Sequence, residues 1–342
     1  MCLYLAAVPV TSKPASRSLI QRLLCPLAGY GNYARSGILG MNRRNISYIS
    51  RYNPRGLFPL VDDKLKTKQL ALEHGLRVPS LLAVIESQSQ VASLDKRLPI
   101  DQGFCIKPAK GSGGKGIMVV TQSEAGGYRK SNGSALSISE IQRHVSNILA
   151  GLFSLGGAPD KAVIESLLSL DSSLKDFSHE GVPDLRVIVF RGVPVMAMMR
   201  LSCSSSHGKA NLHQGAVGVG IDIGTGKAIK AVQRDKAIQY HPDTQHNLHE
   251  LVVPHWQELL QLSCACYDMT GLGYLGVDLV LDEKNGPTVL ELNARPGLSI
   301  QIANGQGLLP RLRLVEKLRR PDRMSVSERE AFAINTFSSL NK

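Results

Sequence analysis

The sequence has few aromatic residues, scattered cysteines and no long apolar segment. Only 5% of its 342 residues are aromatic, which disfavours binding of single-stranded nucleic acid by base stacking. The six cysteines form no CxxC pair and have no histidines at zinc-ligand spacing, so we expect buried, reduced thiols. No apolar run approaches the roughly 20 residues that span a bilayer. No basic segment precedes an apolar core near the first residue, so we expect no signal peptide, no membrane partner and a cytoplasmic protein.

The residues that are abundant indicate a globular protein with anionic partners. Hydrophobic residues make up 43% of the chain, and its length suits two domains or one domain with a large insertion. The formal net charge of +12 favours nucleotides, nucleic acid or acidic peptides as partners. The charge alone does not choose among these classes.

Helical and strand patterns begin near residue 61. Residues 1–60 have no long periodic segment, which predicts an irregular basic extension. Its segments 41–45 and 51–55 are equally compatible with binding of an acidic acceptor and with a solvated basic extension. From residue 61 the pattern predicts a helix that begins at Asp62 or Asp63 and ends at Gly75. Further along, antiparallel hairpins alternate with helices, which predicts an α+β protein.

A hairpin over residues 275–293 carries a cluster of oxygen ligands. If Asn285-Gly286 is a two-residue turn, Lys284 pairs with Pro287 and Asp278 lies opposite Asn293. Glu291 then points to the same face, because side chains alternate along a strand. Two carboxylates and an amide oxygen suit Mg²⁺, although a solvated sheet face is the alternative. A three-residue turn would reverse the parity and weaken the case.

A glycine-rich loop, KPAKGSGGKG at 107–116, lies between two predicted strands. It is not a P-loop, because position 109 is alanine and position 116 is glycine. Its glycines allow backbone N–H groups to approach an anion, and Lys115 lies at its tip. Lys107 lies within the preceding strand, where a lysine is expected only beside a negative charge. We therefore predict a phosphate-binding loop that closes as a lid.

The order of these motifs resembles the ATP-grasp superfamily, and within it the α-L-glutamate ligases. The resemblance rests on IKPAKGSGGKG, VIESLL, DLRVIVF, MMRL, NLHQGA, GVDLV and ELNARPGL, and it covers residues 61–318. It implies an ATP-grasp fold in which two α+β subdomains clamp ATP. Relatives usually have an α/β domain before the first ATP-binding strands, and residues 1–60 are too few to form it. The expected division is an extension at 1–60, a small lid subdomain at 61–160, a large subdomain with the Mg²⁺ site at 161–320 and a tail at 321–342.

The resemblance also implies roles for individual residues. The nucleotide would be held by Lys107 at the α- and β-phosphates, by Ser112, Gly113, Gly114, Lys115 and Gly116 as the glycine lid, by Glu165, Ser166 and Leu167 at the adenine, by Asp184 near the ribose, and by the segment from Lys209 to Asn211. The metal ligands would be Asp278, Glu291 and Asn293. The catalytic residues near the transferred phosphoryl group would be Arg186, Arg200 and Asn211, with Arg295 nearby.

The implied reaction is amide-bond formation. A carboxylate would attack the γ-phosphoryl group of ATP, and an amine would then displace phosphate from the acyl phosphate. The expected cofactors are ATP and Mg²⁺, for which Mn²⁺ can substitute. The expected partners are an amino acid such as glutamate and a peptide or protein acceptor, with a homo-oligomer also compatible. The alternatives are an ATP-grasp phosphotransferase and a basic nucleic-acid-binding protein, although nucleic acid leaves the acidic hairpin unexplained.

Overall fold

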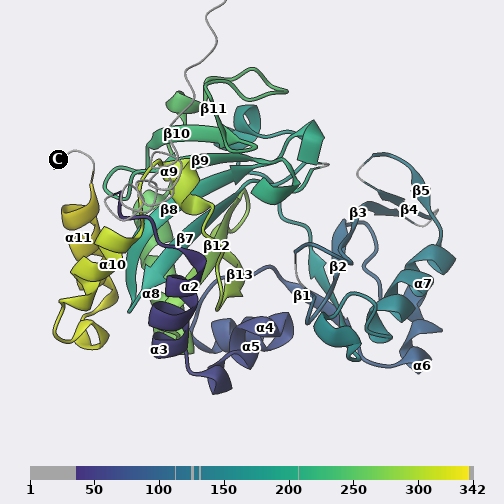
Figure 1. The fold of residues 1–342 in the computed structure, drawn as a ribbon. Coiled ribbons are helices and arrows are strands. Elements are labelled where there is room, and N and C mark those ends of the chain that lie inside the picture. Colours follow the sequence, from purple (N-terminus) through teal and green to yellow (C-terminus); the bar gives the residue numbers. More distant parts are fainter. Residues whose placement is uncertain (1–35, 112, 125–126, 131, 207, 339–342) are drawn as a thin grey trace, which may run out of the picture.

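Two antiparallel β-sheets, each with its own hydrophobic core, form the protein. The computed structural model describes residues 36–111, 113–124, 127–130, 132–206 and 208–338. The smaller sheet has six strands in the order β1-β6-β2-β3-β4-β5, and the larger has seven in the order β11-β10-β9-β8-β7-β12-β13 (Figure 1). Helices accompany both sheets, which confirms the predicted α+β class.

The smaller sheet contains the strands on either side of the glycine-rich loop. Its strands are β1 (Leu81–Ile85), β2 (Phe104–Pro108), β3 (Met118–Glu124), β4 (Gly127–Lys130), β5 (Ala135–Leu136) and β6 (Ala162–Ser166). Helices α6 (Gln88–Val91) and α7 (Ile138–Leu149) pack against each other, and α7 also packs on β2 and β6. A capping box at Ser137 and Glu140 fixes the start of α7, whose apolar side then enters the small core. This arrangement holds β2 and the loop on a rigid support.

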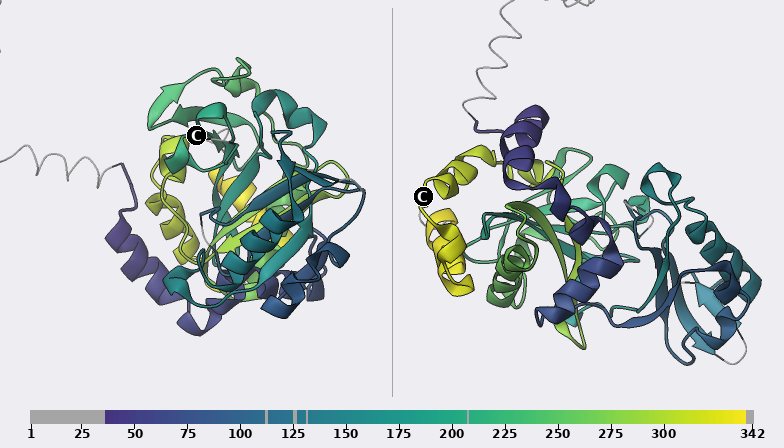
Figure 2. Two further views of the ribbon diagram at one scale, coloured as in Figure 1. Left: turned by 90° about the vertical axis from the view of Figure 1, so that its right-hand side faces the viewer. Right: turned by 90° about the horizontal axis from the view of Figure 1, so that it is seen from below.

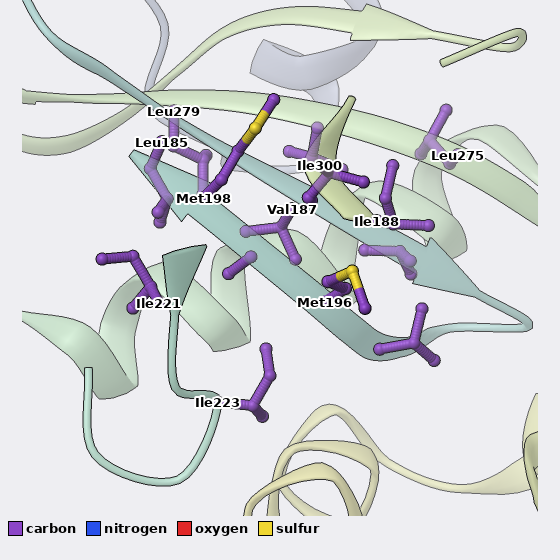
Figure 3. Close-up of a cluster of buried hydrophobic side chains, with 14 of the residues drawn as sticks. Leu185, Val187, Ile188, Met196, Met198, Ile221, Ile223, Leu275, Leu279 and Ile300 are labelled. Atoms are coloured by element: carbon purple, nitrogen blue, oxygen red, sulfur yellow. The ribbon is translucent and has the colours of Figure 1, made fainter. Parts of the chain in front are cut away.

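The larger sheet carries most of the buried apolar surface. Its strands are β7 (Asp184–Phe190), β8 (Val193–Leu201), β9 (Val217–Ile221), β10 (Ala228–Gln233), β11 (Lys236–Ile238), β12 (Tyr274–Asp282) and β13 (Gly286–Asn293). Figure 3 shows part of this core, with Leu185 and Val187 of β7 packed among side chains of β8, β12 and α9. Because β7, β8 and β12 are buried on both faces, charged residues on them require partners.

Helices surround the larger sheet. They are α4 (Pro59–Asp62), α5 (Lys64–Glu73), α8 (Trp256–Thr270), α9 (Ile300–Asn304), α10 (Leu309–Glu316) and α11 (Val326–Phe337). Helix α5 begins where the sequence predicted, because the Asp63 side chain accepts hydrogen bonds from two N–H groups of its first turn. Helix α11 packs on α8 and β8, so the segment after residue 320 contains a packed helix instead of only a tail.

The segment after residue 40 is helical, which contradicts the predicted irregular extension over that part. A continuous helical stretch comprises α2 (Met41–Arg43), the π-helix η1 (Arg44–Ile49) and α3 (Ser50–Tyr52). Tyr48 and Tyr52 contact the ring of Phe190 edge-on, with centroids 5.5 and 4.9 Å away. Burial of these aromatic rings outweighs the weak helical propensity of the Asn- and Arg-rich sequence. Residues 1–35 lie outside the described part of the chain.

The two cores place the subdomain boundaries differently from the sequence pattern. The smaller core runs from Ile85 to Ile164, so β6 belongs to it. Helix α5 instead contributes Ala71 to the larger core, because it packs on β13 and α8. Figure 2 shows the two bodies side by side, with α4 and α5 near the junction. The junction, and not the glycine loop alone, is therefore where residues from both sheets meet.

Candidate active site

A row of charged side chains crosses four adjacent strands of the larger sheet. Arg200 of β8 lies opposite Asp184 of β7, and Arg186 of β7 lies opposite Asp278 of β12. Asp278 in turn lies opposite Glu291 of β13. Directly opposed residues of antiparallel strands share a face, so these side chains form one continuous row, which we call the charged row. The sequence-predicted residues Arg186, Arg200, Asp184, Asp278 and Glu291 are thus brought together.

The register of the β12–β13 hairpin differs from the prediction. Asp282 pairs with Gly286, so the turn has three residues and not two. The side chain of Asp282 accepts a hydrogen bond from the N–H of Asn285 at 3.0 Å, which stabilises the longer turn. The predicted pairing of Lys284 with Pro287 is therefore wrong, because Pro287 pairs with Leu281.

A β-bulge restores the parity that the longer turn would have reversed. Leu279 pairs with Val289, but Asp278 pairs with Glu291, so Leu290 is the extra residue. Asp278 therefore lies opposite Glu291, and not opposite Asn293 as predicted. Asn293 is two residues further along β13, so all three predicted ligands still share one face. The three residues lie on one face of the hairpin, but the predicted register is wrong.

Two arginines hold the carboxylates of the charged row. Arg186 donates from Nε and Nη2 to the two oxygens of Asp278, both at 2.5 Å. Arg200 donates from Nε to Asp184 at 2.8 Å, and its Nη2 bridges the second oxygen of Asp184 and Asp278, the latter at 2.8 Å. Each guanidinium uses its Nε–Nη2 edge in these pairs, which leaves the two N–H groups of Nη1 for another anion.

Burial and the arginines set the protonation states in the row. Burial raises the pKa of Asp184 to about 6, and the charge of Asp278 adds to this, although Arg200 opposes it. Burial also raises the pKa of Asp278, but Arg186 and Arg200 outweigh it and bring the value to about 2. Arg200 stays charged because its two carboxylate neighbours outweigh its desolvation and raise its pKa. Asp278 is therefore ionised at neutral pH.

A pocket at the junction of the sheets is lined by three lysines and two glutamates. Lys107 of β2 lies 2.5 Å from one oxygen of Glu165 on β6, and Lys68 of α5 lies 2.9 Å from the other. The side chains of all three residues are at most 8% exposed, so this triad is buried. Lys107 thus has the negative partner that its place in a strand required, and burial lowers the pKa of Lys68.

The third lysine of the pocket connects the two sheets. Lys64 donates to the carbonyl of Gly111 at 2.6 Å, and its Nζ lies 3.2 Å from Glu291. Sequence reasoning missed both Lys64 and Lys68. Their spacing in a helix that begins at Asp63 was a usable signal, because residues four apart lie on one helix face.

The glycine loop has the backbone conformations that its composition predicted. Gly113, Gly114 and Gly116 have φ of +65°, +72° and +75°, which residues with a Cβ rarely adopt. The carbonyl of Gly116 contacts the Nε2 of His144 at 2.9 Å. Lys115 is exposed, and Ser112 lies outside the described residues. The loop is therefore anchored at its end and open at its tip.

The other predicted residues lie at the edges of this arrangement. Ser166 pairs through its backbone N–H with the carbonyl of Ser80, and half-buried Leu167 follows it at the end of β6. Asn211 caps a short helix by accepting from the N–H of His213 at 3.0 Å, while Lys209 is exposed. In the described part of the chain, neither Lys209 nor Asn211 contacts the charged row, so the structure does not bring them into it.

The oxygen donors at the end of the charged row are of the type that Mg²⁺ prefers. Within the described ranges, no three carboxylate, histidine or cysteine side chains gather as a metal site, and the third oxygen donor on the face of Asp278 and Glu291 is the amide of Asn293. Its Oδ1 accepts the N–H of Arg295 at 2.8 Å, which orients it. Asp278 is ionised, and both it and Glu291 already contact cationic side chains. Hard oxygen donors beside cationic groups are what a metal bound together with phosphates requires.

Several solved structures are similar to this chain. No curated protein matches the chain. Among solved structures, it is similar to the ATP-grasp ligase PsnB complexed with minimal precursor (15% identity, TM-score 0.41, 78% of this chain and 63% of that chain). It is also similar to the D-cycloserine synthetase DcsG (17%, 0.43, 78% and 71%) and to the D-alanine–D-alanine ligase from Bacillus anthracis complexed with ATP (14%, 0.40, 81% and 66%). The chain thus spans less than two thirds of the PsnB chain.

A protein family accounts for most of the chain. Residues 43–317 match the family described as Sugar-transfer associated ATP-grasp. This range includes the charged row, the lysine pocket and the glycine loop, and it confirms the ATP-grasp fold that the motif order predicted. The chain belongs to the sugar-transfer associated ATP-grasp family.

Proposed function

We propose that this protein is an ATP-dependent carboxylate–amine ligase that forms an amide bond through an acyl phosphate. The observation that carries the proposal is the charged row, whose last residue, Glu291, also lines the pocket that contains the three lysines, while Asn293 lies on the same face of β13. Oxygen ligands for a metal beside cations for phosphates are the two requirements of phosphoryl transfer from ATP.

The lysine pocket would receive the nucleotide. Lys107 and Lys68 share the single carboxylate of Glu165, so the triad carries an excess of one positive charge. A polyphosphate would draw the lysines from Glu165 and supply the missing negative charge. The glycine loop would close over the phosphates and exclude water that could hydrolyse the acyl phosphate. Glu165, Ser166 and Leu167 lie at the end of β6, where a flat ring could enter between the sheets.

The residues of the charged row would act on the reacting groups. Magnesium, when bound to Asp278, Glu291 and Asn293, supplies charge neutralisation at the phosphates. Arg186 and Arg200 would direct their Nη1 groups at the transferred phosphoryl group and then at the oxyanion formed when the amine attacks. Asp184 would hold Arg200 in this orientation through its bidentate contact. No side-chain nucleophile is needed.

The substrates are an amino acid, such as glutamate, and the carboxylate of a peptide or protein acceptor. The resemblance of the motif order to α-L-glutamate ligases supports this choice. The basic character of the chain, with net charge +12, favours an acceptor that carries acidic groups.

The test is an incubation of the purified protein with Mg-ATP, amino acids and acidic peptides. A ligase releases ADP and phosphate only when both substrates are present, and mass spectrometry detects an amide product. A stable phosphorylated product would identify a phosphotransferase instead, and no turnover with tight RNA binding would favour a nucleic-acid-binding protein. Either outcome would refute the proposal.

Two variants test the site assignment. Asp278→Asn and Lys107→Ala should each lower amine-dependent ADP release by roughly a hundredfold or more, as expected for loss of a charge contact at the reacting phosphates. Asp235→Asn and Lys236→Ala serve as matched controls, because both residues are exposed at the β10–β11 turn. Full activity in either site variant would contradict the assignment.

A further inference from the structure

The positive charge of the chain is concentrated at its N-terminal end. The first 61 residues contain no aspartate or glutamate and eight cationic residues: Lys13, Arg17, Arg22, Arg35, Arg43, Arg44, Arg51 and Arg55. These eight account for two thirds of the net charge of +12. None of these eight residues is among those assigned to the metal, the nucleotide or the reacting groups.

Part of this charge lies on the helical segment formed by α2, η1 and α3. Arg43 and Arg51 are exposed on this segment, and Arg55 is exposed directly after it. Arg313 of helix α10 and Lys317, directly after this helix, are also exposed. We call these five residues the basic face. Figure 2 shows the N-terminal helices beside the C-terminal helices in the right-hand view.

Side-chain contacts hold the two parts of the basic face together. The hydroxyl of Tyr52 donates to Glu316 of α10 at 3.2 Å, and the guanidinium of Arg51 lies over the Tyr52 ring at 5.2 Å. Burial and Glu316 raise the pKa of Tyr48, while Arg43 and Arg313 both lie close enough to oppose this shift. The contact of Tyr52 with Glu316 places Arg51, next to Tyr52, and Arg313, one turn before Glu316, on adjoining parts of the protein.

The helical segment is also rigidly attached to the larger sheet. The amide of Asn53 donates to the carbonyls of Tyr274 and Ala294 at 2.7 and 2.9 Å, and it accepts the N–H of Tyr274. Arg44 donates to the carbonyl of Pro296 at 2.9 Å. Because these contacts fix the backbone, the exposed arginines project from a preformed helix.

Large apolar side chains are exposed among the cations. Met41 is 64% exposed and Ile46 is 72% exposed, and both lie on the same helical segment as Arg43. Leu314 of α10 is 42% exposed between Arg313 and Lys317. Exposed apolar side chains flanked by arginines are typical of helices that lie in the interface of a membrane. Exposure to water alone does not favour large apolar side chains among these arginines.

In contrast to the expectation from the sequence of no membrane partner, we propose that the basic face docks the protein on an anionic phospholipid surface. The cations would contact the headgroups, while Met41, Ile46 and Leu314 would enter the boundary with the acyl chains. The contact we describe is peripheral. Among the described residues, a search for helices with the length and apolar composition of a membrane span finds none. A nucleic acid fits this face less well, because Tyr48 is buried and Tyr52 is half-buried, which leaves no exposed ring in the helical segment for base stacking.

The strength of docking should follow the number of arginines. Each cation near an anionic lipid surface contributes roughly a fivefold increase in partitioning at moderate salt. The double variant Arg43→Gln with Arg51→Gln should therefore lower partitioning by roughly 25-fold if the two contributions add. The attraction should fall steeply when the Debye length drops from about 10 Å at 0.1 M salt to about 3 Å at 1 M.

Vesicle co-sedimentation with the full-length protein tests the proposal. The wild-type chain should sediment with phosphatidylcholine vesicles that contain phosphatidylglycerol, and not with phosphatidylcholine alone. The arginine double variant and Ile46→Ser should each reduce the bound fraction. Arg234→Gln with Lys236→Gln removes the same charge from the exposed β10–β11 turn and should bind like wild type.

Three outcomes would overturn the proposal. The first is no sedimentation of the wild-type chain with anionic vesicles, and the second is equal loss in the arginine double variant and the control double variant. The third is binding of a single-stranded RNA that the arginine variant loses while vesicle binding is unchanged. Circular dichroism of each variant establishes that it is folded. These outcomes do not depend on the proposed ligase activity.

Discussion

Removing the carboxylate of Glu165 should destabilise the protein strongly, because it leaves two buried lysines without a counter-charge. The Nζ atoms of Lys107 and Lys68 lie 2.5 and 2.9 Å from its two oxygens. At an effective dielectric constant of about 20, each pair is worth roughly 6 kcal/mol of Coulomb attraction. Glu165→Gln loses both attractions. It regains only the free energy that desolvation of the glutamate carboxylate costs in the wild type, which is several kcal/mol.

We expect the free energy of unfolding of Glu165→Gln to be about 3–5 kcal/mol lower than that of wild type near neutral pH. Urea unfolding followed by circular dichroism measures this difference. Hydrogen exchange in β2 and β6 should show faster opening of those strands. Glu86→Gln is the matched control, since it breaks the half-exposed pair of Glu86 with Lys161 and should cost about 1 kcal/mol or less.

The loss of unfolding free energy in Glu165→Gln, which we call its deficit, should also depend on pH. Burial lowers the pKa of folded Lys68 below its ordinary value of 10.5, and loss of the glutamate lowers it further. Between the lowered pKa of Lys68 in the folded variant and its value of 10.5 in the unfolded chain, the unfolded chain binds more protons than the folded chain. The free energy of unfolding of the variant therefore rises as the pH rises through this range. The deficit should therefore shrink between about pH 7 and pH 10. A deficit below about 1 kcal/mol, or one that is constant with pH, would refute the assignment of a buried, charged triad.

Three further predictions concern the loop and the charged row. Gly116→Ala should distort the glycine loop and lower turnover, because its φ is +75° and a Cβ would lie 2.5 Å from the ring of Phe153; unchanged kinetics would contradict this. Lys64→Ala breaks the contact with Glu291 across the junction, so small-angle scattering should show a larger radius of gyration than for wild type. Burial raises the pKa of Asp184 to about 6, so its protonation should stabilise the folded wild type as the pH falls from about 7 to 5. Asp184→Asn should lose that part of the pH dependence in urea unfolding, and an unchanged dependence would show that another group titrates.

Local sequence patterns predicted much of the site. The glycines of the loop, the alternation of Asp278 on its strand and the N-cap at Asp63 depend on neighbours in the chain. Such neighbours can be read without knowing the fold. The order of the motifs also identified the superfamily. Each of the seven motifs is weakly specific, but their occurrence in this order along the chain is specific. The functional roles of the individual residues remain predictions for the experiments above.

Other features depended on contacts between distant parts of the chain. The helix at 41–52 is stabilised by burial of Tyr48 and Tyr52 on residues more than a hundred positions away, so its weak propensity gave no signal. The bulge at Leu290 corrected the parity of the hairpin, and such a local defect has no clear sequence signature.

The sequence by itself determined which residues have the chemistry for this site, because residue type and strand alternation specify donors and faces. Only the tertiary structure decided their partners. Arg186 meets Asp278 across 92 positions of sequence, and Lys64 reaches both sheets from a helix between them. These pairings follow from the order of strands in the sheet and from the packing of α5 at the junction, which no local pattern encodes.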